Sequence, residues 1–127
     1  MNSNEDKAIA TIQKILRDTK DARIKWHVAN FRISQIKGLG ANEEIIGHVY
    51  TTNISNKHLR LYRYKTKYFV DEERTELIDY IRLEFYETFD YNTEWVFPYT
   101  NALDDLYIAI MAQTAGVNDF FDEYLID

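Results

Sequence analysis

The middle of the chain is a series of segments in which apolar residues recur at every second position, and each segment ends at a polar or glycine-containing turn. This alternation is typical of half-buried strands, because successive side chains of a strand point to opposite faces. Strands joined by short turns pair antiparallel, so the sequence predicts an antiparallel meander of four to five strands. We expect these strands at residues 23–31, 44–54, 58–70, 77–89 and, for a short fifth, 95–97. Gly47 is a candidate β-bulge, and residues 71–76 are expected to form a polar loop.

Both ends of the chain change to helical spacing. Residues 4–19 carry an apolar stripe made of Ile9, Ile12, Ile15 and Leu16. Residues 100–116 carry a second stripe, and Gly116 is a natural helix end. A last short helix is expected after Asn118, with Phe120 or Phe121, Tyr124 and Leu125 pointing inward. We therefore predict a single α+β domain over residues 1–127, with an N-terminal helix, the meander sheet and two C-terminal helices packed on one face.

Composition excludes several classes of protein. The chain has no Cys, so no disulfide framework, thiolate metal site or Cys nucleophile is expected, and a reducing cytoplasm is compatible with this. The first residues lack the basic and apolar regions of a signal peptide, and the apolar runs are too short to span a bilayer. We expect a cytoplasmic location and no membrane partner.

The net charge of −6 conceals a strong asymmetry. Residues 1–67 hold 13 Lys and Arg and 6 Asp and Glu, a net of +7, whereas residues 68–127 hold 2 and 15, a net of −13. One interpretation is that the two halves interleave in space and neutralise each other. The other is that they form opposed patches that steer partners or drive head-to-tail association.

The stretch LRLYRYKTKYF, residues 59–69, concentrates cations and aromatic rings. Strand alternation places four of its side chains on one face, namely Arg60, Tyr62, Tyr64 and Tyr68. The following strand adds Tyr80, Arg82, Glu84 and Tyr86 to the same face. Cross-strand Arg–Glu and Tyr–Tyr pairs would then stabilise the sheet. Tyr and Arg are also enriched in protein interfaces, so an exposed face would suit a protein partner or a homodimer. The candidate interaction face consists of Arg60, Tyr62, Tyr64, Tyr68, Tyr80, Arg82 and Tyr86.

A surface for single-stranded nucleic acid or another polyanion is an alternative use of the same strand. Cations and stacking aromatics have the right chemistry for it. Two observations argue against nucleic acid as the partner. The chain lacks the Lys/Arg-Gly-Phe/Tyr pattern of RNA-binding sheets, and its isoelectric point near 5.0 is acidic.

Metal binding and catalysis find little support in the sequence. His27, His48 and His58 fall on three successive predicted strands, and three imidazoles would suit zinc. However, no His-x-His or His-x3-His pair is present, and histidines on exposed strand faces explain the pattern equally well. The adjacent carboxylates at residues 43–44, 72–73 and 104–105 have no motif that would raise a pKa for acid–base work. We assign no catalytic residue, metal or cofactor.

Both ends of the chain resemble a loose group of small α+β proteins of bacterial and prophage genomes. In that group a helix ending in Thr precedes an Ile-x-Trp strand, and a Leu-x-x-Leu-Tyr helix and a short acidic helix close the chain. Here the matching residues are Thr19, Ile24, Trp26, Leu103, Leu106 and Tyr107. The resemblance implies the fold and a bacterial or phage setting, but no activity.

The function favoured by the sequence is a non-enzymatic protein-interaction module that self-associates through the Tyr- and Arg-rich sheet face. An inhibitor or immunity-type protein of a mobile element, and a polyanion binder, are the alternatives.

Overall fold

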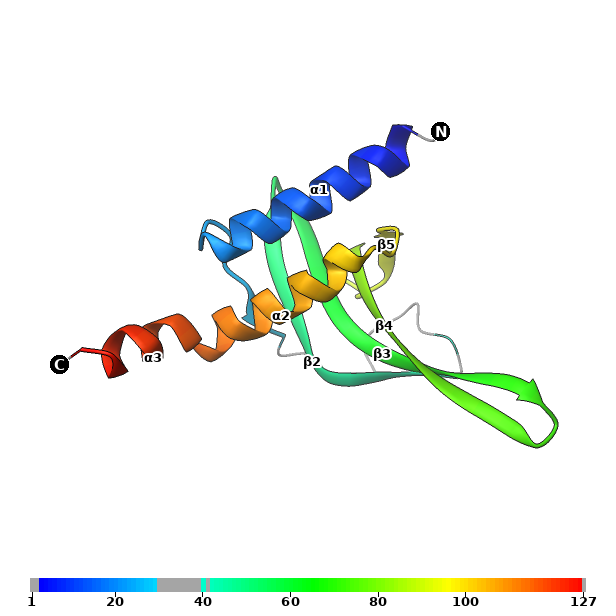
Figure 1. Cartoon of the computed structure of the whole chain (residues 1–127). Helices are drawn as coiled ribbons and strands as arrows, with labels where there is room; N and C mark the ends of the chain where they lie inside the picture. The colour runs from blue at the N-terminus through cyan, green and yellow to red at the C-terminus, as the bar shows by residue number, and fades with distance from the viewer. Residues whose placement is uncertain (1–2, 30–39, 41, 127) are drawn as a thin grey trace.

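The computed structural model describes residues 3–29, 40 and 42–126 and confirms the α+β class. Five strands form one antiparallel sheet in chain order, which is the predicted meander (Figure 1). The elements are α1 (Ser3–Lys20), β1 (His27–Val28), β2 (Glu43–Ile54), β3 (Lys57–Asp71), β4 (Arg74–Tyr86), β5 (Thr93–Val96), α2 (Asn101–Ala115) and α3 (Val117–Tyr124).

The main core lies between one face of the sheet and the helices α1 and α2, which cross that face side by side (Figure 1). The alternation of β3 and β4 turns Leu59, Leu61 and Leu83 toward the helices, and each is at most 2% exposed. The apolar stripes of α1 and α2 pack against these residues. The helical side of the core consists of Ala8, Ile12, Ile15, Leu103, Leu106 and Ile110.

The register of β2 against β3 shifts between Ile46 and Tyr50, so the predicted bulge is present. Gly47 adopts φ = 74°, a conformation that side chains with a Cβ rarely adopt. Bulges bend a strand and increase its twist. Figure 1 shows the consequence, since β2 bends strongly along its length.

The prediction of a polar loop at residues 71–76 is wrong. β3 continues to Asp71 and β4 begins at Arg74, so only residues 72–73 make the turn. The paired strands therefore extend beyond the helices as a two-stranded projection (Figure 1). We call residues 67–77 the arm. The alternation of β4 puts Leu77 on the same face as the buried Leu83, but Leu77 lies on the arm, past the helices, and is 59% exposed.

The C-terminal helices follow the expected order but not the expected packing. α2 ends at Gly116, whose φ is 70° and whose N–H donates to the carbonyls of Ala112 and Gln113. α3 begins immediately afterwards and runs away from the sheet (Figure 1), and none of its residues is buried. The prediction that its large side chains point inward is wrong, because this helix lies past the face that α1 and α2 cover. Phe120, Phe121, Tyr124 and Leu125 are 51–77% exposed.

The strand expected at 23–31 is much shorter, and residues 30 and 31 lie outside the described part of the chain. Residues 23–26 are instead fixed by hydrogen bonds to neighbouring elements. The Asp18 carbonyl accepts from the backbone N–H of Arg23 at 2.8 Å. Gln113 of α2 accepts from the Trp26 N–H at 2.7 Å and donates to the Ile24 carbonyl at 2.8 Å. These contacts join the segment after α1 to α2.

Candidate functional site on the long hairpin

The seven residues of the candidate interaction face share one face of β3 and β4, opposite the helices. Arg60 lies directly across from Glu84, Tyr62 from Arg82, and Tyr64 from Tyr80. The predicted alternation is therefore confirmed. The two ends of this face differ in their surroundings, however. We call the part formed by residues 59–62 and 82–86 the inner ladder.

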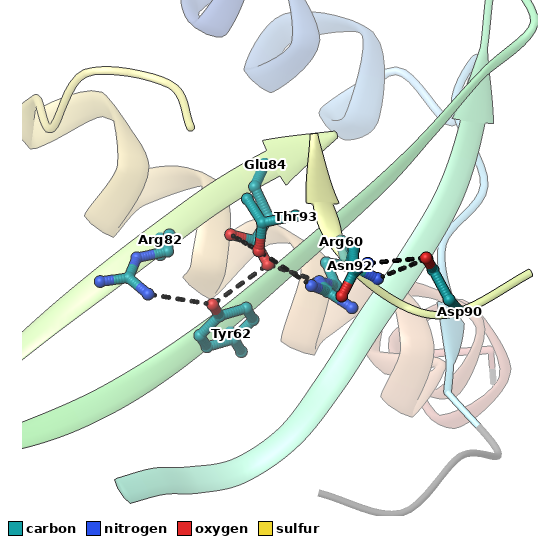
Figure 2. Close-up of polar contacts among 7 residues, drawn as sticks. All are labelled: Arg60, Tyr62, Arg82, Glu84, Asp90, Asn92 and Thr93. Carbon is teal, nitrogen blue, oxygen red and sulfur yellow. Dashed lines mark hydrogen bonds and ion pairs between the residues drawn. The ribbon is translucent and has the colours of Figure 1, made fainter. Parts of the chain in front are cut away.

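The inner ladder contains a buried ion pair. Arg60 and Glu84 are both 0% exposed, and the Arg60 Nε donates to Glu84 Oε1 at 2.5 Å (Figure 2). Thr93 of β5 completes the contact, because its hydroxyl accepts from Arg60 Nη2 at 3.2 Å and donates to Glu84 Oε2 at 3.2 Å. The Arg60 guanidinium also lies 4.8 Å from the centre of the Tyr86 ring.

Tyr62 connects this pair to a second one. Its hydroxyl donates to Glu84 Oε1 at 3.1 Å and accepts from Arg82 Nη1 at 3.3 Å (Figure 2). Arg82 Nη2 then donates to Glu43 of β2 at 3.3 Å. Burial, with a contribution from the Glu84 charge, raises the pKa of Tyr62 far above its usual value. Two Arg and two Glu thus form a charge-balanced network that crosses three strands.

The bend of β2 explains why this part of the face is buried. Ile45 and Val49 pack against Tyr62 and form a second small core, joined by Tyr64 and Ala29. The sequence leaves open whether this face is exposed or covered, and here Arg60, Tyr62 and Tyr86 are buried, with exposed fractions of 0%, 0% and 7%. A buried carboxylate that already binds Arg, Tyr and Thr is saturated with donors, and we assign the network a structural role.

The outer end of the same face is open. Tyr68 is 59% exposed and Tyr80 is 37% exposed, and their neighbours Phe69, Val70 and Leu77 are 64%, 42% and 59% exposed. Arg82 lies 4.4 Å from the centre of the Tyr64 ring, which in turn contacts the Tyr80 ring at 5.7 Å. The aromatic row therefore continues outward from the network to the arm, where large apolar side chains face solvent on both sides.

Three ion pairs join the two oppositely charged halves of the sequence across the sheet, as one of the two interpretations predicts, while Lys14–Asp18 and Lys65–Glu44 lie within the first half. Lys57 binds Glu94 at 3.8 Å, Arg60 binds Glu84, and Arg63 binds Asp79. Each pair joins a cation from residues 1–67 to an acid from residues 68–127. Within residues 59–69, Arg60, Arg63 and Lys65 all form ion pairs inside the chain, which argues against a polyanion surface on this strand.

The three histidines do not converge. His27 and His58 line one hollow, whereas the His48 ring lies 6.1 Å from that of Tyr50. Within the described residues, no three His, Cys, Asp or Glu side chains gather closely enough to hold a metal ion. No helix in the described part of the chain has the length and apolar content that a membrane crossing requires.

Sequence reasoning missed two members of the network, Glu43 and Thr93. Glu43 comes into reach only through the register of β2 beyond the bulge, and Thr93 only through the pairing of β5 with β4. The alternation of apolar and polar residues in a single strand predicts neither register. The acidic residue at position 84, opposite a cation, was the one available signal.

Comparison with known proteins gives no relative for this chain: no family model, curated protein or solved structure matches it.

Proposed function

We propose that this protein is an interaction module that self-associates by pairing the outer edge of β4 with the same edge of a second copy. The observation that carries the proposal is the sequence of residues 74–84, RTELIDYIRLE. Placed antiparallel to itself about Asp79, this segment sets opposite charges and apolar residues against one another.

The geometry leaves this edge open. β5 pairs with β4 only from Glu84 to Tyr86, and the Phe97 N–H donates to the Leu83 carbonyl at 2.9 Å. In the described part of the chain, no strand lies beside residues 74–82 on that side, although the Tyr99 ring packs against the Tyr80 ring at 6.2 Å. An open strand edge presents unpaired backbone N–H and C=O groups, which a further strand can bind.

The side chains fit a two-fold arrangement about Asp79. Glu76 would lie opposite the second copy's Arg82, Leu77 opposite the second copy's Ile81, and Ile78 opposite the second copy's Tyr80. Residues directly opposite across an antiparallel pair share a face, so each of these pairs would be in contact. The two Asp79 carboxylates would meet at the axis, where each is already bound to Arg63 of its own chain.

Pairing would also stabilise the arm itself. A two-stranded ribbon is only marginally stable in water, whereas four strands with shared apolar faces are more stable. Association would cover part of Leu77 and Tyr80, which are now exposed to solvent. The proposal thus retains the self-association expected from the sequence and moves the contact from the buried inner ladder to the β4 edge.

Analytical ultracentrifugation of wild type and two matched variants tests the proposal. Glu76→Arg places a cation against the second copy's Arg82 twice, and we expect it to weaken the dimer by about 1–4 kcal/mol, roughly fivefold or more. Glu72→Arg makes the same charge change at the tip of the arm and should leave the dimer unchanged.

A wild type that stays monomeric at its highest soluble concentration would overturn the proposal. So would equal weakening by the two variants, because that would indicate general charge effects. Circular dichroism of each variant checks that the fold survives.

The setting of this function follows from the sequence. A cytoplasmic location suits a chain without Cys, and the resemblance to small bacterial and prophage proteins favours a bacterial or phage origin. A monomeric wild type would favour the alternative, an inhibitor or immunity-type protein that offers the same edge to a different protein.

A further inference from the structure

A hollow of about 580 Å³ lies at the end of the sheet away from the arm, between the segment after α1 and the end of the hairpin where β2 turns into β3. Its volume falls within the range of about 300–1,000 Å³ that is typical of small-molecule sites. The residues that line it are Arg23, Ile24, Lys25, His27, Thr51, Thr52, Asn53, Ile54, Ser55, His58 and Tyr86.

The charged residues that line this hollow are all basic. It contains two permanent cations, two imidazoles and four hydroxyl groups, and no Asp or Glu. In a chain with 21 acidic residues and a net charge of −6, a hollow without a carboxylate is a notable local reversal of charge. The Thr52 hydroxyl already donates to the Lys25 carbonyl. The cations, the imidazoles and the other hydroxyl groups of the lining suit an anion with several acceptor oxygens.

The backbone that presents the cations is fixed. Arg23, Lys25 and His27 all line the hollow, whereas Trp26 belongs to the core and is 3% exposed. The Thr52 hydroxyl donates to the Lys25 carbonyl at 2.6 Å, and Gln113 accepts from the Trp26 N–H. Little backbone ordering is therefore needed when an anion binds.

The nearby charges leave this site positive. The Asp18 carboxylate lies beside Arg23, but Lys14 binds it directly at 2.7 Å and is the main reason why the Asp18 pKa is lowered. At the floor, the Tyr86 hydroxyl is hydrogen-bonded to Thr51, and Arg60 lies beneath the Tyr86 ring. The rings of His58 and Tyr86, 6.0 Å apart, form an aromatic side of the hollow.

From these contacts we propose that the hollow is a binding site for the phosphate group of a small molecule. Arg23 and Lys25 contact the phosphate oxygens, and His27, Thr51 and Ser55 supply further donors. The His58 and Tyr86 rings then accept an organic part of the ligand. This site is independent of the proposed dimer edge.

Isothermal titration calorimetry at low salt tests the site with two probes, inorganic phosphate and adenosine monophosphate. The double variant Arg23→Gln/Lys25→Gln should bind adenosine monophosphate about tenfold more weakly or worse, because two charge-assisted contacts are lost. The double variant Lys65→Gln/Lys67→Gln removes the same charge from the start of the arm and should stay within about twofold of wild type.

Amide chemical shifts locate the binding independently of the variants. Titration should move the signals of Thr51, Ser55 and His58. Equal affinity for both probes assigns the site to the phosphate group alone, and tighter binding of the nucleotide adds the aromatic side. The proposal is overturned if neither probe binds, if both double variants weaken binding equally, or if the shifts move on the arm instead.

Discussion

The inner ladder and the arm are two parts of the same pair of strands, and they share one alternating pattern but have opposite environments. In the inner ladder, helices cover one face and the bent β2 covers the other, so Tyr62 and Leu61 are both 0% exposed. In the arm, Tyr68 and Phe69 also alternate, and both are more than half exposed. Alternation therefore decides which residues share a face, but only the neighbouring layers decide whether that face is buried.

The same difference applies to the ion pairs. Arg60–Glu84 is fully buried, whereas both members of Arg63–Asp79 are about 42–43% exposed. A buried charge loses its hydration and depends on its partner, while an exposed one is screened by water. These two cross-strand ion pairs of one hairpin, the first directly opposite and the second diagonal, should thus respond very differently to mutation.

The largest effect is expected when the buried pair is broken. Glu84→Ala leaves the Arg60 charge buried without its carboxylate and should lower the free energy of unfolding by about 3–5 kcal/mol. The double variant Arg60→Met/Glu84→Leu replaces the pair by apolar residues of similar size and should be far less damaging. Urea unfolding followed by circular dichroism measures both. A single variant that costs no more than the double one would contradict the account of the inner ladder.

Loss of one hydroxyl should have an intermediate effect. Tyr62→Phe removes a donor to Glu84 and an acceptor for Arg82, and we expect a cost of about 1–3 kcal/mol. Tyr68→Phe on the arm is the matched control, and its exposed hydroxyl should contribute less than about 0.5 kcal/mol. The same unfolding experiment compares the two, and equal costs would remove the distinction between the two regions.

Alkaline pH should weaken the inner ladder in a specific window. Burial raises the pKa of Tyr62 and of Tyr86 above the value of 10.0 that an unfolded tyrosine has. Above pH 10 the unfolded chain releases protons that the folded chain retains, so the stability that these groups contribute is present below pH 10 and is lost as pH rises beyond it. Unfolding midpoints measured on both sides of pH 10 should fall less steeply in Tyr62→Phe. An identical fall in both proteins would refute this assignment.

The smallest effect is expected at the exposed pair. Asp79→Asn removes the partner of Arg63 and should lower the free energy of unfolding by only about 0.2–1 kcal/mol. The measurement is made at a concentration where the protein is monomeric, so that the dimer edge does not contribute. Added salt should reduce the difference further, and a cost as large as that of Glu84→Ala would show that exposure does not govern these pairs.

Much of the fold could be predicted from the sequence because local chemistry determines it. Gly47 at the bulge and Gly116 at the helix end both adopt positive φ, which a glycine signals by itself. Alternation also predicted that Arg60, Tyr64, Tyr80 and Glu84 share one face of the sheet, although it could not predict their register. The predictions that failed concerned burial, which depends on elements far away in the sequence. The burial of Tyr62 depends on how β2 bends, and the exposure of Phe120 depends on where α3 lies relative to the sheet. A polar composition at residues 71–76 also suggested a loop, although solvent-exposed strands are equally polar.

The hydrogen bonds of Gln113 impose an order on the assembly of this molecule. They connect Gln113 to Trp26 and Ile24, which precede it by 87 and 89 positions. At a synthesis rate of about 5–20 residues per second, a ribosome needs roughly 4–17 s to travel that distance. β5 ends at Val96, 17 residues before Gln113, so the complete set of strands precedes the Gln113 contacts by about 1–3 s of synthesis. Until α2 packs, Leu61 and Leu83 lack the helix that covers them.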